Sequence, residues 1–351
     1  MLPLGIPETN PTSIFEYFRG NYGTELLTAA VAHFDVFGRL AKQPRTLAEL
    51  QLELRLAERP AIVLTTALRA MQLLEKNTAG QFELTAIAAE HLVRGQEFDV
   101  GSYLSLAATS PGVMEMVERL RTNRPAGLSG DEAGAAFIYR DGMKSAMEQT
   151  QLAAHFTLAL SGRAKNVAPM MATQIPLQNA TTLLDVGGGT GIYSIAFLRA
   201  NPQLRAIVFD RPEVLKTAEV FVADYGVAAR VQLQSGDMFA DPLPHADVIL
   251  LSNILHDWDV TECQTLIHRC AAALNPGGRL IIHDVLLNDE LDGPLPIALY
   301  SAALFTLTEG RAYSASEYNG WLRNAGLQPQ PPIATLIHCH AIVARSSQPC
   351  F

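Results

Sequence analysis

The segment of this sequence with the clearest chemical potential is a carboxylate followed by closely spaced glycines. Asp185 lies near the end of the short apolar run Thr182–Val186. It is followed, before a helical pattern opens, by glycines at alternating positions: Gly187, Gly189 and Gly191. This order predicts a first parallel strand that passes into a ligand-binding turn and the N-terminus of a helix. Glycines are needed there because a side chain would block the approach of the backbone to a ligand, and because such turns often require positive φ.

The spacing of these glycines does not match a dinucleotide-binding fingerprint, which requires glycine at its first, third and sixth positions. Counted from Gly187 the sixth position is Ile192, and counted from Gly189 it is Ser194. A pyrophosphate binds free N–H groups at a helix N-terminus, whereas a carboxylate beside the turn suits a cationic ligand better. An acid two residues before G-x-G-x-G resembles the first motif of S-adenosylmethionine-dependent methyltransferases, whose cofactor carries a sulfonium cation and no phosphate. A turn whose glycines serve only packing is the alternative.

Further polar side chains follow the next predicted strands, at the edge where an open α/β sheet binds its ligands. Asp210 ends the second strand about 20 residues beyond the glycine turn, where a carboxylate can accept hydrogen bonds from both ribose hydroxyls. Capping of the next helix is the alternative role for Asp210. Asp237 ends the third strand and is expected to bind the adenine amino group, while Met238 covers the ring face. An acid in a loop without a binding role is the alternative for Asp237. Ser252 ends the fourth strand and is also assigned to the cofactor.

His256 follows the fourth strand directly, at the mouth of the same crevice, and is the candidate catalytic base. Methyl transfer to a phenol needs an oxygen nucleophile, and a phenol with a pKa near 10 is mostly protonated at neutral pH. An imidazole within hydrogen-bond distance of the hydroxyl can remove the proton as the new bond forms. The chain has nine histidines, so a structural role for His256 is the alternative.

The elements that must position these residues alternate regularly through the C-terminal half, where apolar runs of strand length are followed by longer helical patterns. This alternation predicts an α/β fold with a doubly wound, Rossmann-like sheet. The N-terminal part has the order helix, helix, helix and short hairpin, which is typical of a winged helix. The predicted domains are a winged-helix-like dimerisation domain at 1–100, a helical linker contributing to the substrate pocket at 101–170, and an S-adenosylmethionine-binding methyltransferase domain at 171–346.

Composition and charge restrict the partners. The 351 residues are 48% hydrophobic, which is enough for two domains with sizeable cores. The net charge of −9 disfavours nucleic acid and anionic membranes as partners. Residues 1–10 lack a signal-peptide pattern, and no apolar run reaches membrane-spanning length. The four cysteines show no C-x-x-C spacing, and a reduced cytoplasmic protein is therefore expected.

Five motifs in a fixed order give the sequence a more specific resemblance. They are the glycine turn, Phe209–Pro212, Gly236–Phe239, Leu255–Asp259 and Asn275–Gly278. Together they resemble the small-molecule O-methyltransferase family, which includes plant caffeate and flavonoid enzymes, acetylserotonin methyltransferase and bacterial polyketide-tailoring enzymes. The resemblance covers nearly the whole chain, because members carry an N-terminal winged-helix-like dimerisation domain. A homodimer is therefore implied.

The resemblance also implies roles for single residues. It makes His256 the general base, and it places on Asp284 the first of two glutamates that flank the base in plant relatives, here shortened by one methylene. The second glutamate falls on Ala312, so that acid is missing. Met143 matches a methionine that contacts substrate in relatives, and Met147 lies one turn further along the same predicted helix face. Both methionines are expected in the substrate wall, with core packing as the alternative.

The expected function is transfer of a methyl group from S-adenosylmethionine to a hydroxyl of a small aromatic metabolite by a homodimeric cytoplasmic enzyme, without a metal. The missing acid at Ala312 motivates an alternative, either methylation of carbon or other chemistry by a tailoring enzyme that binds the cofactor. An iron or zinc site built from His256, Asp257, His283 and Asp284 is a further possibility. A DNA-binding regulator is the alternative outside enzymology, and the acidic N-terminal segment disfavours it.

Overall fold

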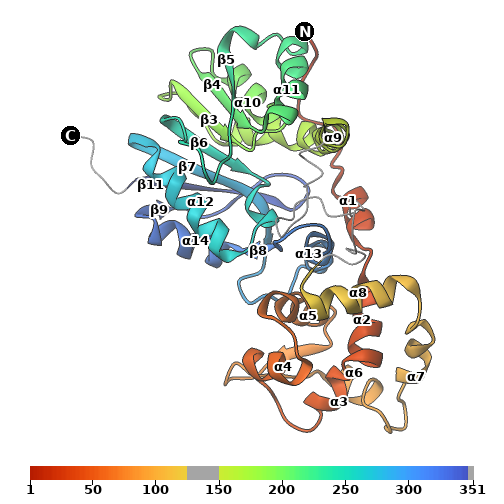
Figure 1. Cartoon of the computed structure of the whole chain (residues 1–351). Helices are drawn as coiled ribbons and strands as arrows, with labels where there is room; N and C mark the ends of the chain where they lie inside the picture. Colours follow the sequence, from red (N-terminus) through yellow and green to blue (C-terminus); the bar gives the residue numbers. More distant parts are fainter. Residues whose placement is uncertain (125–149, 347–351) are drawn as a thin grey trace. The chain divides into compact units, whose positions relative to one another are not determined.

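A computed structural model of the chain describes residues 1–124 and 150–346 (Figure 1). The chain divides into two compact units. The first unit consists of Met1–Phe15, Phe137–Leu286 and Tyr313–Phe351, and the second of Glu16–Ala136 and Leu287–Ala312. The three domains expected from the sequence stay a prediction, and the division by contacts differs from them in placing residues 287–312 with the N-terminal part of the chain.

The first unit is built on a sheet with the strand order β10-β11-β7-β6-β3-β4-β5, beside which β8 pairs with β7 and β9 with β11. Its strands are β3 (Thr182–Val186), β4 (Arg205–Asp210), β5 (Val231–Ser235), β6 (Ala246–Ser252), β7 (Leu274–Leu287), β8 (Tyr313–Ser314), β9 (Leu327–Pro329), β10 (Ile333–Ala334) and β11 (Cys339–Ser346). Strands β3 to β7 pair in parallel, and β11 runs antiparallel to β7. The predicted doubly wound α/β class is confirmed, and β3 lies at the point where the strand order reverses.

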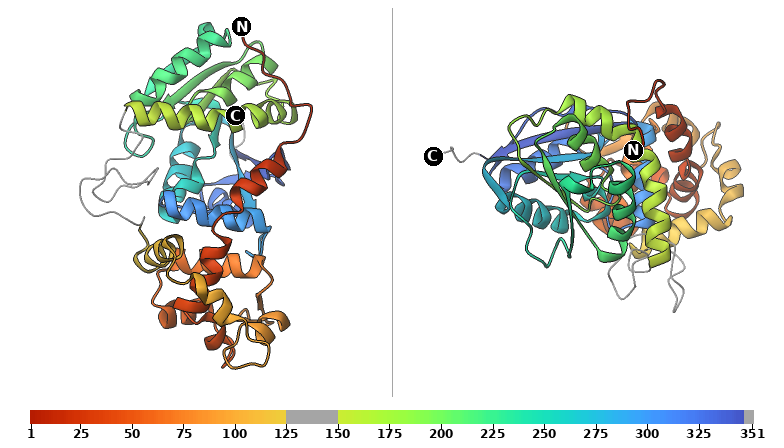
Figure 2. Two further views of the ribbon diagram at one scale, coloured as in Figure 1. Left: turned by 90° about the vertical axis from the view of Figure 1, so that its right-hand side faces the viewer. Right: turned by 90° about the horizontal axis from the view of Figure 1, so that it is seen from above.

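Helices cover both faces of this sheet (Figures 1 and 2). They are α9 (Thr150–Gln174), α10 (Ile192–Ala200), α11 (Pro212–Asp224), α12 (Val260–Ala272) and α14 (Ala315–Asn324). Leu183 of β3 packs in a core with residues of α9, α10 and α11. Its neighbour Leu184 packs in a separate core with residues of α12 and α14. Because side chains alternate along a strand, a continuous apolar strand such as β3 requires helices on both sides.

The second unit is mainly helical. It contains α2 (Gly23–Thr28), η1 (Ala29–His33), α3 (Val36–Leu40), α4 (Leu47–Leu54), α5 (Glu58–Ala70), the hairpin β1 (Leu74–Lys76) and β2 (Phe82–Leu84), α6 (Ala86–His91), α7 (Gly101–Leu104), η2 (Ser105–Ala107), α8 (Pro111–Thr122) and α13 (Leu295–Leu307). The succession of α3, α4, α5 and the hairpin has the order expected of a winged helix, an assignment that stays a prediction. Helix α1 (Thr12–Arg19) crosses the boundary between the units.

Helix α13 explains why the second unit includes a late segment of the chain. Its side chains Leu299, Ala302 and Phe305 are buried in one core with residues of α2, α5 and α8. Helix α13 is apolar along its whole length, so it needs burial on several sides, which these helices provide. None of the helices in the described ranges has the length and apolar character needed to cross a membrane.

Candidate active site

The glycine turn after β3 has a backbone conformation that favours glycine. The φ angles of Gly187, Gly189 and Gly191 are 67°, 58° and 72°, in the left-handed region. A Cβ atom at Gly187 would lie 2.4 Å from Cδ1 of Ile254, so a larger residue does not fit there. A Cβ atom at Gly189 would meet no heavy atom of the described residues within 4 Å, so these residues leave the turn open at that position. The predicted contact of Gly187 and Gly189 with a cofactor stays a prediction.

Asp185 is buried, and its carboxylate faces the first turn of α10. Its Oδ2 atom accepts a hydrogen bond of 2.7 Å from the hydroxyl of Ser194. Burial raises the pKa of Asp185 to about 6, the Ser194 hydrogen bond opposes the rise, and the charge of Asp210 adds to it. Because Asp185 is only 1% exposed, an effect on a bound cation would act through its charge rather than through an exposed contact. Its assignment to the cofactor stays a prediction.

Asp210 holds the glycine turn from the end of β4. Its Oδ2 atom accepts a hydrogen bond of 2.9 Å from the backbone N–H of Gly189, and its Oδ1 atom accepts one of 2.7 Å from the N–H of Arg211. Burial raises the pKa of Asp210 to about 6, although both backbone bonds lower it. A carboxylate has about four acceptor sites, so two remain for ribose hydroxyls after these bonds. The N-cap of α11 is Arg211, so Asp210 is not the capping residue of that helix.

Asp237 and Met238 follow β5 in a tight turn. The Oδ1 atom of Asp237 accepts a hydrogen bond of 2.7 Å from the N–H of Phe239, and the N–H of Asp237 donates one of 2.8 Å to Oδ2 of Asp241. Asp237 is exposed, while Met238 is half-buried against the core between the sheet, α12 and α14. This arrangement leaves an exposed carboxylate beside a thioether. Their predicted contact with adenine remains a prediction.

Ser252 belongs to a partly buried chain of hydrogen bonds. The Thr335 hydroxyl donates to a backbone carbonyl, so its oxygen accepts from Nε2 of His283 at 3.1 Å. Burial lowers the pKa of His283 to about 3, which keeps the ring neutral. With Nε2 protonated, Nδ1 of His283 accepts a hydrogen bond of 3.0 Å from the Ser252 hydroxyl. The Ser252 oxygen can then accept from the next residue, Asn253.

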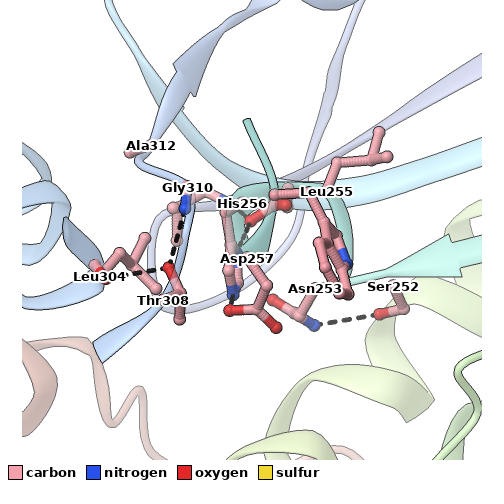
Figure 3. Close-up of polar contacts among 12 residues, drawn as sticks. Ser252, Asn253, Leu255, His256, Asp257, Leu304, Thr308, Gly310 and Ala312 are labelled. Carbon is pink, nitrogen blue, oxygen red and sulfur yellow. Dashed lines mark hydrogen bonds and ion pairs between the residues drawn. The ribbon is translucent and has the colours of Figure 1, made fainter. Parts of the chain in front are cut away.

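Asn253 ends this chain and was missed by the analysis of the sequence. Its side-chain nitrogen donates to Ser252 Oγ at 3.0 Å (Figure 3). The same nitrogen donates to the hydroxyl of Tyr193 at 3.2 Å. Its Oδ1 atom is buried and has no hydrogen-bond partner among the described residues. Such an acceptor is costly unless a donor reaches it. The only sequence signal was its position directly after an apolar strand.

His256 and Asp284 lie in contact although 28 positions separate them in the chain. The parallel pairing of Ser252 with His283 places the residue after His283 beside the turn that follows β6, and η5 (Leu255–Asp257) carries His256 there. Nδ1 of His256 lies 2.5 Å from Oδ1 of Asp284, which also accepts the N–H of Val285 at 2.8 Å. Because a carboxylate only accepts, Nδ1 carries the proton and the lone pair of neutral His256 lies on Nε2. The predicted pair is therefore brought together, and its catalytic role stays a prediction.

A second carboxylate lies beside the imidazole, and the sequence analysis did not give it this role. Oδ1 of Asp257 is 3.6 Å from Nε2 of His256, the ring nitrogen that carries the lone pair in this tautomer (Figure 3). Asp257 is 7% exposed. Asp257 therefore supplies a second carboxylate beside His256, although the acid expected at position 312 is missing. The bend of η5 brings Asp257 to this place. Ala312 is buried in the second unit, where its N–H donates to Oγ of Ser301 at 3.1 Å.

The charges around His256 decide its protonation. Burial lowers the pKa of His256, but the charges of Asp284 and Asp257 outweigh it, so the pKa lies above its usual value of 6.5. Burial acts to raise the pKa of Asp284, yet His256 holds it below its usual range. Burial raises the pKa of Asp257 to about 6. The positive charge of Arg163 on α9 lowers the pKa of all three groups.

The other predicted positions are the two methionines and the possible metal ligands. Met143 and Met147 lie outside the described residues. His283 and Asp284 are neighbours on a strand and point to opposite faces, His283 toward Ser252 and Asp284 toward His256. The four side chains considered for iron or zinc therefore do not converge on one point. Within residues 1–124 and 150–346, no group of three or more His, Cys, Asp or Glu side chains is arranged to hold a metal ion.

Comparison with known proteins identifies relatives along most of the chain. Residues 131–328 match the family model described as an O-methyltransferase domain. The chain is 34% identical over 319 residues to 3-hydroxy-5-methyl-1-naphthoate 3-O-methyltransferase of Streptomyces sahachiroi, covering 90% of this chain and 89% of that protein. The crystal structure of an O-methyltransferase family 2 protein from Planctomyces limnophilus, in complex with apigenin, matches with a TM-score of 0.88 and 47% identity over 98% of both chains. Human N-acetylserotonin methyltransferase in complex with S-adenosylmethionine matches with a TM-score of 0.59 and 25% identity, over 96% of this chain and 97% of that one.

Proposed function

We propose, from the premise that this chain belongs to the O-methyltransferase family, that it methylates a hydroxyl group of a small aromatic metabolite. The chain is an S-adenosylmethionine-dependent methyltransferase. Two relatives support the aromatic substrate, since one is named for a hydroxylated naphthoate and the other is bound to apigenin. Both compounds carry hydroxyl groups on aromatic rings. The roles given below to single residues are part of this proposal.

The strand ends of the first unit fit the cofactor chemically. Among the described residues nothing fills the left-handed turn at Gly189, and the two backbone hydrogen bonds to Asp210 leave about two of its acceptor sites for ribose hydroxyls. The buried Oδ1 of Asn253 is an acceptor that an ammonium group of the cofactor can satisfy. Asp185 adds negative charge, which favours a cationic ligand. When bound, S-adenosylmethionine supplies an electrophilic methyl group on its sulfonium.

His256 is the general base in this proposal. Its Nδ1–H donates to Asp284, which fixes the tautomer and directs the lone pair of Nε2 away from that carboxylate. Nε2 takes the proton of the substrate hydroxyl as the oxygen attacks the methyl group, and Asp284 stabilises the resulting imidazolium. The raised pKa makes His256 a stronger base, at the cost of a smaller neutral fraction at a given pH. Asp257 lies close enough to Nε2 to stabilise the proton after transfer.

The observation that carries the proposal is the 2.5 Å contact between Nδ1 of His256 and Asp284, in a setting where the histidine is 5% exposed. The test replaces this base. His256→Ala is expected to lower kcat by about 10²–10⁴-fold, the usual scale for general acid–base catalysis, with little change in the affinity for S-adenosylhomocysteine measured by calorimetry. His268→Ala, on the exposed surface of α12, is the matched control.

The assay follows transfer of a labelled methyl group to a panel of phenols and locates the label in the product. Unaltered turnover of His256→Ala would remove this residue from its role. Label on carbon rather than oxygen would reject the proposed reaction in favour of carbon methylation. Loss of cofactor binding in the variant would mean that His256 acts on the cofactor site instead.

We also propose that the enzyme is a homodimer, located in the cytoplasm. Helix α1 exposes large apolar side chains that a soluble monomer rarely leaves uncovered, since Ile14, Tyr17 and Phe18 are 67%, 86% and 76% exposed. The three cysteines within the described residues are buried free thiols, in keeping with a reducing compartment. Light scattering of Phe18→Asp, with Leu52→Asp as an equally exposed control, tests the dimer. A monomeric wild-type chain would refute it.

A further inference from the structure

We propose that Tyr318 of α14 is a positioning residue that holds the carboxylate of Asp284 in register with His256. This inference rests on the proposed function and adds to it a residue that does not touch substrate. The Tyr318 hydroxyl donates to Oδ2 of Asp284 at 3.2 Å. Oδ1 of the same carboxylate receives Nδ1 of His256. Each oxygen of Asp284 thus accepts a hydrogen bond from a different side chain, Oδ2 from Tyr318 and Oδ1 from His256.

The hydrogen bond from Tyr318 restricts rotation of the Asp284 carboxylate, which would otherwise break its contact with His256. A carboxylate whose Oδ2 had no partner could rotate about its Cβ–Cγ bond and release the imidazole. With Oδ2 bound to Tyr318 and Oδ1 bound to the N–H of Val285 as well as His256, rotation would break several hydrogen bonds at once. Asp284 is 1% exposed, so water cannot readily replace a lost partner.

Tyr318 is itself held rigidly. It is fully buried, and its ring packs edge-on against Tyr313 and Trp321, with centroid distances of 5.8 Å and 5.5 Å. A capping box between Ser314 and Glu317 fixes the start of α14 one turn earlier. Burial raises the pKa of the Tyr318 phenol well above 10, and the charge of Asp284 adds to this. The hydroxyl therefore stays protonated and acts as a donor throughout the working pH range.

The hydrogen bond also influences how strongly His256 holds its proton. A donor on Oδ2 draws negative charge away from Oδ1 and so weakens the attraction between Asp284 and the imidazolium. Removing the donor leaves Oδ2 of Asp284 without the Tyr318 hydrogen bond, so the carboxylate attracts the imidazolium of His256 more strongly, while the N–H of Val285 and the charge of Arg163 still act on it. The other charged groups that act on His256 are Asp257 on η5 and Arg163 on α9, and a change at Tyr318 leaves both in place.

The neighbouring tyrosine offers a matched control. Tyr313 belongs to the same ring cluster and is equally buried, but its hydroxyl donates to the backbone carbonyl of Trp258 at 2.6 Å. Replacing either tyrosine by phenylalanine removes one buried hydroxyl from the same cluster. Only the change at Tyr318 removes a donor from the carboxylate that contacts His256.

The experiment measures the pH dependence of kcat and the NMR titration of the His256 ring in Tyr318→Phe and Tyr313→Phe. Tyr318→Phe is expected to raise the apparent pKa of the acid limb by about 0.5–1, and to lower kcat by about 5–50-fold with the KM for the cofactor little changed. Tyr313→Phe is expected to lose stability but to keep the acid limb of the wild type. Equal acid limbs in the two variants would overturn the inference.

A second variant keeps the tyrosine ring. Site-specific incorporation of 3-fluorotyrosine at position 318 makes the phenol a stronger donor, so the pKa of His256 should fall rather than rise. A rise, or no change, would overturn the inference even if Tyr318→Phe did not fold. Full activity of His256→Ala would instead refute the proposed base, and the His256 titration still reports the Tyr318 contact in that case.

Discussion

Replacing Asp185 by asparagine tests whether the buried acid beside the glycine turn is kept for the cofactor at a cost in stability. The pKa of Asp185 rises from 3.8 to about 6 in the fold, mainly through burial. An acid with a raised pKa binds its proton more tightly in the folded state than in the unfolded chain. Its contribution therefore favours folding at low pH and is lost as the pH rises through about 6.

The size of this effect follows from the two pKa values. One pKa unit corresponds to about 1.4 kcal/mol, so ionising Asp185 within the fold costs on the order of 3 kcal/mol above pH 6. Asparagine has nearly the same shape, stays neutral, and its oxygen can still accept from Ser194. Asp185→Asn is therefore expected to stabilise the cofactor-free protein at pH 8. At about 2–4 °C per kcal/mol for domains of this size, the melting temperature should rise by about 5 °C or more.

The assay is thermal unfolding of both proteins between pH 5 and pH 8, with and without S-adenosylmethionine. Wild type should lose stability as the pH rises, and Asp185→Asn should lose less. Ser194→Ala is the complementary control, because the Ser194 hydroxyl lowers the pKa of Asp185. Its loss should make the fall of stability with rising pH steeper. The variant should also gain less from the cofactor, since it lacks a negative charge near a cation. Parallel pH curves for wild type and Asp185→Asn would refute the reasoning.

Further predictions concern the glycine turn, helix α9 and the base. Gly187→Ala would place a Cβ atom 2.4 Å from Ile254 at a φ of 67°, so we expect a loss of about 1–3 kcal/mol in unfolding experiments. Gly162→Ala, at an exposed position within α9 where a Cβ atom meets none of the described residues within 4 Å, should instead raise the free energy of unfolding by about 0.5–1 kcal/mol. The rate should rise as the pH passes the pKa of the His256 imidazolium, so the acid limb should lie above pH 6.5. Asp284→Asn should move that limb to lower pH and reduce kcat, because it removes the charge that raises this pKa. A limb that stays in place in Asp284→Asn would contradict the assigned pairing.

His256 and Asp284 could be proposed as site residues before the structure was known, but the contact between them could not be derived from local sequence. His256 could be proposed from the sequence because a histidine directly after a strand of a doubly wound sheet lies at the ligand-binding edge. Asp284 could be proposed only from the resemblance to known enzymes. The 2.5 Å contact between them depends on the parallel register of β6 and β7, which no local pattern encodes.

Other features could not be read from the chain at all. Asp257 was visible as the neighbour of His256, but its distance of 3.6 Å from Nε2 results from the bend of η5. The Asn253 oxygen that has no partner among the described residues is recognised only when side chains from four segments, those of Thr335, His283, Ser252–Asn253 and Tyr193, are joined into one hydrogen-bond chain. Helix α13 follows the sheet in sequence, yet its apolar surface is buried in the second unit.

The sequence by itself determined the class of fold, the glycine turn and the residue types at the strand ends, because these depend on local periodicity and on backbone conformations that favour glycine. The tertiary structure decided which of those residues face one another. Asp185 turned toward Ser194, and Asp284 received His256 on one oxygen and Tyr318 on the other. Strand register and helix packing set these contacts, and both depend on how distant segments pack together.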